Sequence, residues 1–209
     1  MDWIVETMER IGRERNAPVY KKILDDPFMV LVSALLSTRT RDEQTHKAVE
    51  RLFSVVKKPE DILKLSEKDI EKLIEPVGFK RVKARNLKKI AEILVRDYGG
   101  SVPRNFDDLL KLPGVGRKVA NIVISHMGIP AIAVDTHVHR IANRIGLVKT
   151  EKPEETEKEL KRIFPKELWS RLNRAFVGFG QTLCKPIKPL CNECPFKMFC
   201  EYFKNLEKS

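Results

Sequence analysis

The chain has 209 residues, of which 42% are hydrophobic and 33% are charged, a composition typical of a water-soluble globular protein with one or two small lobes. No apolar run is long enough to span a bilayer. Forty Lys and Arg against 29 Asp and Glu leave a formal net charge of +11, which favours a polyanionic partner. A basic surface that serves solubility or heat resistance is the alternative. A membrane surface is disfavoured, because no basic amphipathic helix with an aromatic apolar face is visible.

Apolar residues recur at three- and four-residue spacing through most of the chain, which predicts an all-α fold of short helices. Pro27 suits the first turn of an apolar, buried helix. Ser66 and Asp69 form an approximate capping box at the start of another helix, and Gly99 is placed to end the helix expected at 82–97. In chain order, the expected helices are 2–15, 27–37, 41–56, 60–65, 67–75, 82–97, 106–111 and one that starts at Arg117.

The stretch from Phe106 to Met127 predicts two helices joined by a tight hairpin. Pro113 ends the first helix, and Gly114 and Gly116 on either side of Val115 allow the backbone to turn sharply and approach a ligand. The next helix begins directly after this turn, and a helix N-terminus offers N–H donors and partial positive charge to a phosphate. A plain turn between core helices is the alternative, but the net charge favours phosphate binding.

Three segments together resemble a known family: LPGVGRK at 112–118, GIP at 128–130 and VDTHVHR at 134–140. Their order and spacing resemble endonuclease III, in the helix-hairpin-helix superfamily of base-excision DNA glycosylases, over most of the chain. The resemblance implies a bifunctional DNA glycosylase and abasic-site lyase, with oxidised pyrimidines as the expected damage. Its implied partner is double-stranded DNA with damaged bases or abasic sites, bound by a monomer.

The same resemblance implies a two-lobed fold. A six-helix bundle with the hairpin would span 21–129, and an iron-sulfur cluster lobe would combine 1–20 with 130–209. The catalytic residues would come from opposite walls of a cleft. The start of the chain shows no basic and apolar leader, so we expect a cytoplasmic protein, associated with the nucleoid if the source is prokaryotic.

Lys118 resembles the family lysine that attacks the sugar C1′ and forms a Schiff base, which permits β-elimination and strand nicking. An ammonium group cannot attack, so the site has to favour the neutral amine. Lys118 is expected in the first turn of its helix, where the positive end of the dipole disfavours the ammonium form. The alternative is an ordinary lysine that contacts a phosphate.

Asp135 resembles the family aspartate that stabilises positive charge on the sugar and assists proton transfer. It also directly precedes a predicted helix, where aspartate is a preferred N-cap, and the two roles are compatible. His137 and His139 lie two positions apart and so point to different sides of that helix, which disfavours a shared metal ion.

All four cysteines lie near the C-terminus, at Cys184, Cys191, Cys194 and Cys200. In a presumed cytosolic chain this clustering favours shared metal coordination over disulfides. Four thiolates suit either zinc or a [4Fe-4S] cluster. The spacing C-x6-C-x2-C-x5-C resembles the cluster loop of endonuclease III, so the resemblance implies a [4Fe-4S] cluster with a structural or DNA-docking role.

Glycosylases that extrude their target nucleotide need side chains to fill the emptied stack. Arg39 stands where the family usually has glutamine, and Phe79 follows Gly78 where an aliphatic wedge is common. Arginine can donate to an orphaned base and phenylalanine can stack, so we predict DNA contacts for both. A core aromatic is the alternative for Phe79.

Two other functions remain open at this point. One is a monofunctional glycosylase of the same superfamily, which Lys118 disfavours. The other is a noncatalytic DNA-binding protein that uses the hairpin for phosphates and zinc for folding. Covalent trapping on DNA by borohydride separates both from the bifunctional enzyme.

Overall fold

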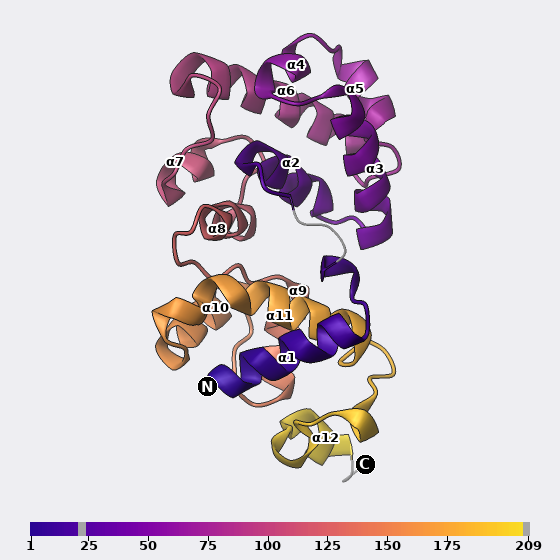
Figure 1. Ribbon diagram of the computed structural model, residues 1–209, viewed down its shortest axis with the longest axis vertical. Coiled ribbons are helices and arrows are strands. Elements are labelled where there is room, and N and C mark those ends of the chain that lie inside the picture. Colours follow the sequence, from indigo (N-terminus) through magenta and orange to yellow (C-terminus); the bar gives the residue numbers. More distant parts are fainter. Residues whose placement is uncertain (21–23, 207–209) are drawn as a thin grey trace. The chain divides into compact units, whose positions relative to one another are not determined.

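The computed structural model describes residues 1–20 and 24–206, and this part of the chain consists of helices joined by short loops, without a β-strand (Figure 1). The all-α prediction is confirmed. The chain divides into two compact units, which are Leu24–Met127, called here the hairpin unit, and Met1–Ile23 with Gly128–Ser209, called the cysteine unit. The domain assignment made from the sequence stays a prediction. No helix in the described residues is long and apolar enough to cross a membrane.

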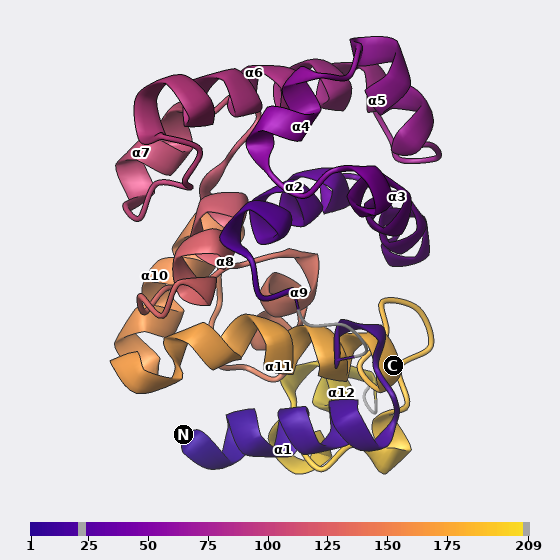
Figure 2. The ribbon, with the colours of Figure 1, turned by 45° about the horizontal axis from the view of Figure 1, so that its top comes forward.

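The hairpin unit, every residue of which is described, contains seven α-helices. They are α2 (Pro27–Ser37), α3 (Asp42–Val55), α4 (Pro59–Leu63), α5 (Glu67–Leu73), α6 (Lys80–Tyr98), α7 (Phe106–Lys111) and α8 (Arg117–His126). The mostly buried helix α2 packs against α3, α6 and α8, while α4 and α5 pack against α6 (Figure 2).

Local signals set the helix ends in this unit, and the expected helices are found to within two residues. Pro27 is the first residue of α2. Ser66 and Asp69 form the expected capping box, because Asp69 N donates to Ser66 Oγ at 3.1 Å and Ser66 N donates to Asp69 Oδ2 at 3.3 Å. Gly99, with φ of 58°, ends α6 in the left-handed conformation that favours glycine.

The cysteine unit is built around α11. Its described elements are α1 (Asp2–Glu14), η1 (Pro18–Tyr20), α9 (Thr136–Arg144), α10 (Pro153–Ile163), η2 (Lys166–Leu168), α11 (Trp169–Thr182), η3 (Cys191–Glu193), η4 (Lys197–Phe199) and α12 (Glu201–Leu206). Helices α1 and α9 both pack against α11. The short 3-10 turns η3 and η4 lie within the segment that carries three of the cysteines.

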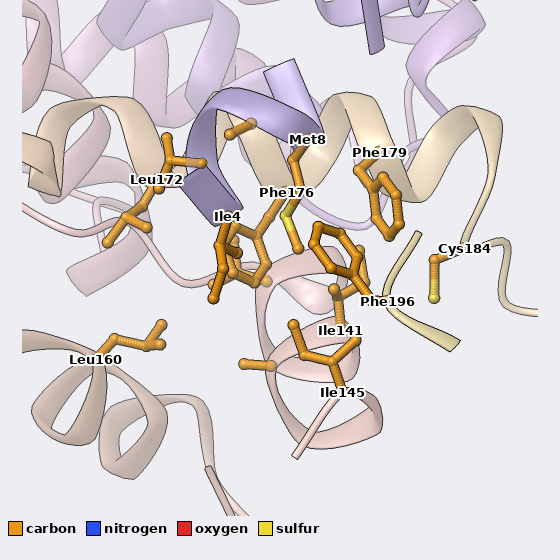
Figure 3. Packing of buried hydrophobic residues seen from close by; sticks show 14 of the residues in the cluster. Ile4, Met8, Ile141, Ile145, Leu160, Leu172, Phe176, Phe179, Cys184 and Phe196 are labelled. Atoms are coloured by element: carbon orange, nitrogen blue, oxygen red, sulfur yellow. The ribbon is translucent and has the colours of Figure 1, made fainter. Parts of the chain in front are cut away.

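Aromatic side chains join the cysteine-bearing segment to the core of this unit. Phe176 and Phe179 of α11 are fully buried with Met8 of α1, and Figure 3 shows Phe196 beside them. Phe196 is itself fully buried, and its ring centroid lies 5.3 Å from that of Phe179. Burial of such a side chain contributes about 2 kcal/mol. Phe196 therefore anchors the loop between Cys194 and Cys200.

Candidate functional site

The predicted hairpin joins α7 to α8, and its two glycines have different structural roles. Gly114 has φ of 81°, a conformation that favours glycine, and a Cβ there would lie 2.4 Å from Asn86 Nδ2, so the end of that side chain would have to move. Gly116 is the N-cap of α8, and nothing lies within 4 Å of where its Cβ would be. Gly116 thus leaves open space in front of the helix.

Val115, the residue between the two glycines, faces inward. Its side chain is buried, and its N–H donates to Leu112 O at 3.1 Å within the hairpin. The contribution of Val115 to this site is therefore to hold the turn against the core. Its main-chain donor is already used.

The start of α8 combines main-chain donors with two positive side chains. The first main-chain bond of the helix runs from Ala120 N to Gly116 O at 3.0 Å, so the N–H groups of residues 117–119 have no acceptor within the helix. Arg117 places its guanidinium 4.9 Å from the ring centroid of Phe106 on α7. This helix end is suited to an anion such as a phosphate.

Lys118 is the second residue of α8 and is half-buried. Its Nζ donates to Ser37 Oγ at 3.3 Å, and Ser37 Oγ in turn donates to Ala34 O at 2.8 Å. Ser37 is the last residue of α2, so the amine is held at the end of a buried helix and is not freely solvated. Ser37 could not be identified from the sequence, because nothing in its local pattern pairs it with a lysine in a distant helix.

Asp135 is the N-cap of α9, as the sequence predicts. Its Oδ1 accepts from the amides of His137 and Val138, both at 2.9 Å, and the side chain is half-buried. Both cap bonds end on one oxygen of the carboxylate. Lys118 belongs to the hairpin unit and Asp135 to the cysteine unit.

The two histidines of α9 make separate contacts. His137 Nδ1 lies 3.2 Å from Arg140 Nη2, whereas His139 Nδ1 lies 2.7 Å from Thr156 Oγ1. His139 Nδ1 also lies 3.5 Å from Asn143 Nδ2, so this histidine contacts both α10 and its own helix.

Arg39 and Phe79 are brought together in the hairpin unit. The Arg39 guanidinium lies 5.6 Å from the ring centroid of Phe79, and both residues have positive φ, 50° and 58°. Phe79 is 61% exposed, so it is not a core aromatic. A Cβ on Gly78 would lie 2.7 Å from Arg39 O, which shows how closely the two loops approach.

The four cysteines are all free thiols within the cysteine unit. Burial, assisted by the negative charges that the other three would carry, raises the pKa of Cys194 to about 11 despite a main-chain hydrogen bond from Phe196. Burial also raises the pKa of Cys184 and Cys191. Repulsion from the other cysteines contributes to the raised pKa of Cys191 as well as that of Cys194. Among the residues that the structure describes, no three His, Cys, Asp or Glu side chains form a group that could hold a single metal ion.

Two arginines of α9 hold the start of the cysteine-bearing segment. Arg140 Nη2 donates to Cys184 O at 2.9 Å, and Arg144 donates to the carbonyls of Lys185 and Pro186 at 2.7 and 2.9 Å. Arg144 Nη1 also lies 3.8 Å from Cys184 Sγ. The sequence analysis missed both arginines, although their i,i+4 spacing places them on one face of α9.

Comparisons with known proteins point to one family. Residues 32–166 match the family described as HhH-GPD superfamily base excision DNA repair protein. Endonuclease III of Thermotoga maritima is 51% identical over 185 residues, which cover 88% of this chain and 86% of that relative. A solved non-covalent endonuclease III–DNA complex has a TM-score of 0.89 at 36% identity and covers 100% of this chain and 97% of that one. A trapped endonuclease III–DNA covalent intermediate has a TM-score of 0.88 at 36% identity, with coverages of 99% and 96%.

Proposed function

The chain belongs to the endonuclease III family of the HhH-GPD superfamily, and from this premise we propose that it excises damaged bases from double-stranded DNA and then nicks the strand. The observation that carries the proposal is the half-buried amine of Lys118, one residue into the helix that follows the glycine hairpin. The solved relative trapped as a covalent intermediate with DNA supports a covalent step. Oxidised pyrimidines are the proposed class of damaged base.

Lys118 is the proposed nucleophile. Its neutral amine attacks C1′ of the damaged nucleotide, and the base departs with the electrons of the glycosidic bond and takes up a proton. The sugar ring of the remaining aminal then opens by loss of the C1′–O4′ bond, which leaves a protonated Schiff base between Lys118 and C1′. Removal of a C2′ proton expels the 3′ phosphate by β-elimination and breaks the strand. Asp135 is proposed to stabilise the positive charge that develops on the sugar and to assist proton transfer. Its N-cap role holds the carboxylate in one orientation, because Oδ1 is bound by two amides.

Borohydride trapping on DNA with an abasic site tests this function. Borohydride reduces a Schiff base to a stable amine, so the protein should become covalently attached to the DNA strand. If the wild-type protein yielded no adduct but released damaged bases, it would be a monofunctional glycosylase. If it did neither, the noncatalytic DNA-binding protein would be the correct alternative.

The DNA contacts proposed for the hairpin unit are of two kinds. Gly114 shapes the turn, Gly116 and the first amides of α8 contact a phosphate, and Val115 packs beneath them. Arg39 and Phe79 are proposed to fill the space left by an extruded nucleotide, since Phe79 is exposed and the guanidinium lies over its ring. The cation–π contact joins an exposed aromatic ring and a positive charge in one pair.

We expect Gly116→Ala to weaken binding of damaged and undamaged duplex alike, by roughly tenfold, because phosphate contacts carry no sequence information. Its fold should be unchanged, since nothing lies within 4 Å of the added Cβ. Binding isotherms at several salt concentrations and thermal unfolding measure both properties. Affinity that does not depend on ionic strength would exclude a phosphate contact at this helix end.

The control for this experiment is Gly114→Ala, in the same hairpin. Its φ of 81° and the clash with Asn86 predict a loss of stability above about 1 kcal/mol. The two variants should therefore separate binding from folding. Equal losses of stability in both would show that Gly116 has only a structural role.

Cys184, Cys191, Cys194 and Cys200 are proposed to hold a [4Fe-4S] cluster. Four free thiols in one C-terminal segment are the donor set that such a cluster needs. When bound, the cluster would supply a structural cross-link between Cys184 and Cys200 and orient the neighbouring lysines toward DNA. The chain itself contributes the anchors Phe196, Arg140 and Arg144, which hold this segment against the core.

Purified protein should be brown and contain iron and acid-labile sulfide. Cys194→Ser should lose most of both and should loosen the C-terminal segment, because metal binding and local folding are coupled. Met198→Ser is the control, since Met198 lies between Cys194 and Cys200 but is 79% exposed. Metal analysis, sulfide analysis and thermal unfolding give the result. Zinc without iron, or full iron content in Cys194→Ser, would contradict this assignment.

The monomeric state and a location in the cytoplasm, with the nucleoid as site of action in a prokaryote, are proposed on the same family basis. The high net positive charge of +11 supports residence on DNA.

A further inference from the structure

Lys83, in the first turns of α6, is a buried lysine that none of the proposed roles uses. It is 5% exposed, and its Nζ donates to Leu36 O at 2.8 Å, Thr38 O at 2.6 Å and Thr40 Oγ1 at 2.9 Å. These acceptors are two carbonyls and a hydroxyl, all uncharged. Burial of an ammonium group among neutral acceptors is unfavourable. All three N–H donors of the ammonium group are therefore used by one short stretch of the chain.

The three acceptors all belong to the end of α2 and the turn that follows it. The last carbonyls of a helix have no main-chain partner within the helix, and an ammonium group satisfies them and complements the negative end of the dipole. Leu36 and Thr38 are the two neighbours of Ser37. Lys83 thus fixes the main chain on both sides of the serine that contacts Lys118.

The third acceptor links this turn to the loop before α6. Thr40 Oγ1 accepts from both Lys83 Nζ and Gly78 N, the latter at 3.1 Å. Residues 36–40 are therefore hydrogen-bonded to Lys83 on α6 and to Gly78 in the loop before α6. Burial, followed by the nearby positive charge of Lys118, lowers the pKa of Lys83 to about 8.

We propose that Lys83 is a positioning residue for the nucleophile: it holds the end of α2 so that Ser37 Oγ meets the amine of Lys118. This inference rests on the proposed lyase function. Lys83 acts through the main chain of residues 36–38 and does not itself contact DNA in the proposal. Loss of its three hydrogen bonds would leave Ser37 free to move, and small displacements of a nucleophile slow its attack strongly.

The test compares Lys83→Met with Lys88→Met. Lys88 lies on the same helix and donates to the carbonyls of Leu63, at 2.9 Å, and Leu65, so it makes the same kind of contact at a place without a proposed functional residue. The measurement is the single-turnover rate constant of borohydride trapping on abasic DNA at saturating protein, with thermal unfolding alongside. We expect Lys83→Met to lower this rate constant by about tenfold or more. Lys88→Met should leave it within about twofold.

A double-mutant cycle separates positioning from general destabilisation. Ser37→Ala removes the hydroxyl through which Lys83 is proposed to act. The effect of Ser37→Ala on the rate constant should largely disappear when it is combined with Lys83→Met. The same substitution should keep its effect when it is combined with Lys88→Met. If Lys83→Met does not fold, Thr40→Val, which removes one acceptor at nearly constant volume, takes its place in the cycle.

Three results would overturn the inference: equal rate constants for the two lysine variants, an unchanged rate constant in folded Lys83→Met, or independent effects of Lys83→Met and Ser37→Ala. Failure of the proposed function looks different. In that case the wild-type protein itself forms no adduct, and Lys83 has nothing to position.

Discussion

Lys118→Gln is expected to abolish borohydride trapping and strand nicking while abasic DNA still binds. The substitution removes the amine nucleophile but keeps a polar side chain of similar length beside Ser37. Loss of a covalent nucleophile lowers turnover on the order of a thousandfold or more. Binding should survive because the hairpin, Gly116 and the amides of α8 remain in place. Adduct yield on gels and fluorescence anisotropy with abasic DNA measure the two properties.

The matched control is Arg117→Gln, which removes one positive charge from the same turn of α8. This variant should bind DNA more weakly but still form the adduct at saturating protein, because its neighbour keeps the amine. If Lys118→Gln still formed the trapped adduct, another amine would perform the attack. If both variants bound DNA more weakly but still formed the adduct, Lys118 would be an ordinary phosphate contact.

Asp135→Asn should lower base excision by about 10²- to 10⁴-fold and leave the fold intact. Asparagine caps helices as well as aspartate, so the bonds from His137 N and Val138 N to the side-chain oxygen can remain. The negative charge proposed to stabilise the sugar is lost. Single-turnover excision on duplex with an oxidised pyrimidine, together with thermal unfolding, gives the two quantities.

Asp26→Asn provides the comparison, because Asp26 caps α2 in the same manner by accepting from Met29 N at 2.9 Å. It should retain full excision activity. An Asp135→Asn protein that was less stable yet fully active per folded molecule would assign Asp135 a capping role alone. If Asp135→Asn and Asp26→Asn were equally stable and both lost excision activity, the loss would be due to altered helix capping in general.

Much of the local structure could be predicted from the sequence because it depends on neighbours in the chain. Helix ends are set by interactions that span three or four residues, as at Ser66 with Asp69 and at the Asp135 cap. Gly99 ends α6 because of its own conformational freedom. The glycine hairpin and the cysteine spacing are likewise local patterns, so the family resemblance that rests on them was visible without a structure.

Only the tertiary structure decided what surrounds these residues. Ser37 meets Lys118 across 81 positions, and Leu36 meets Lys83 across 47. The exposure of Phe79 was likewise open in the sequence, since an aromatic before a helix suits either a core or a surface. Periodicity determines which residues form a helix and which face is apolar. The packing of those helices determines which distant side chains meet, because each contact depends on the shapes of all the surfaces that pack together.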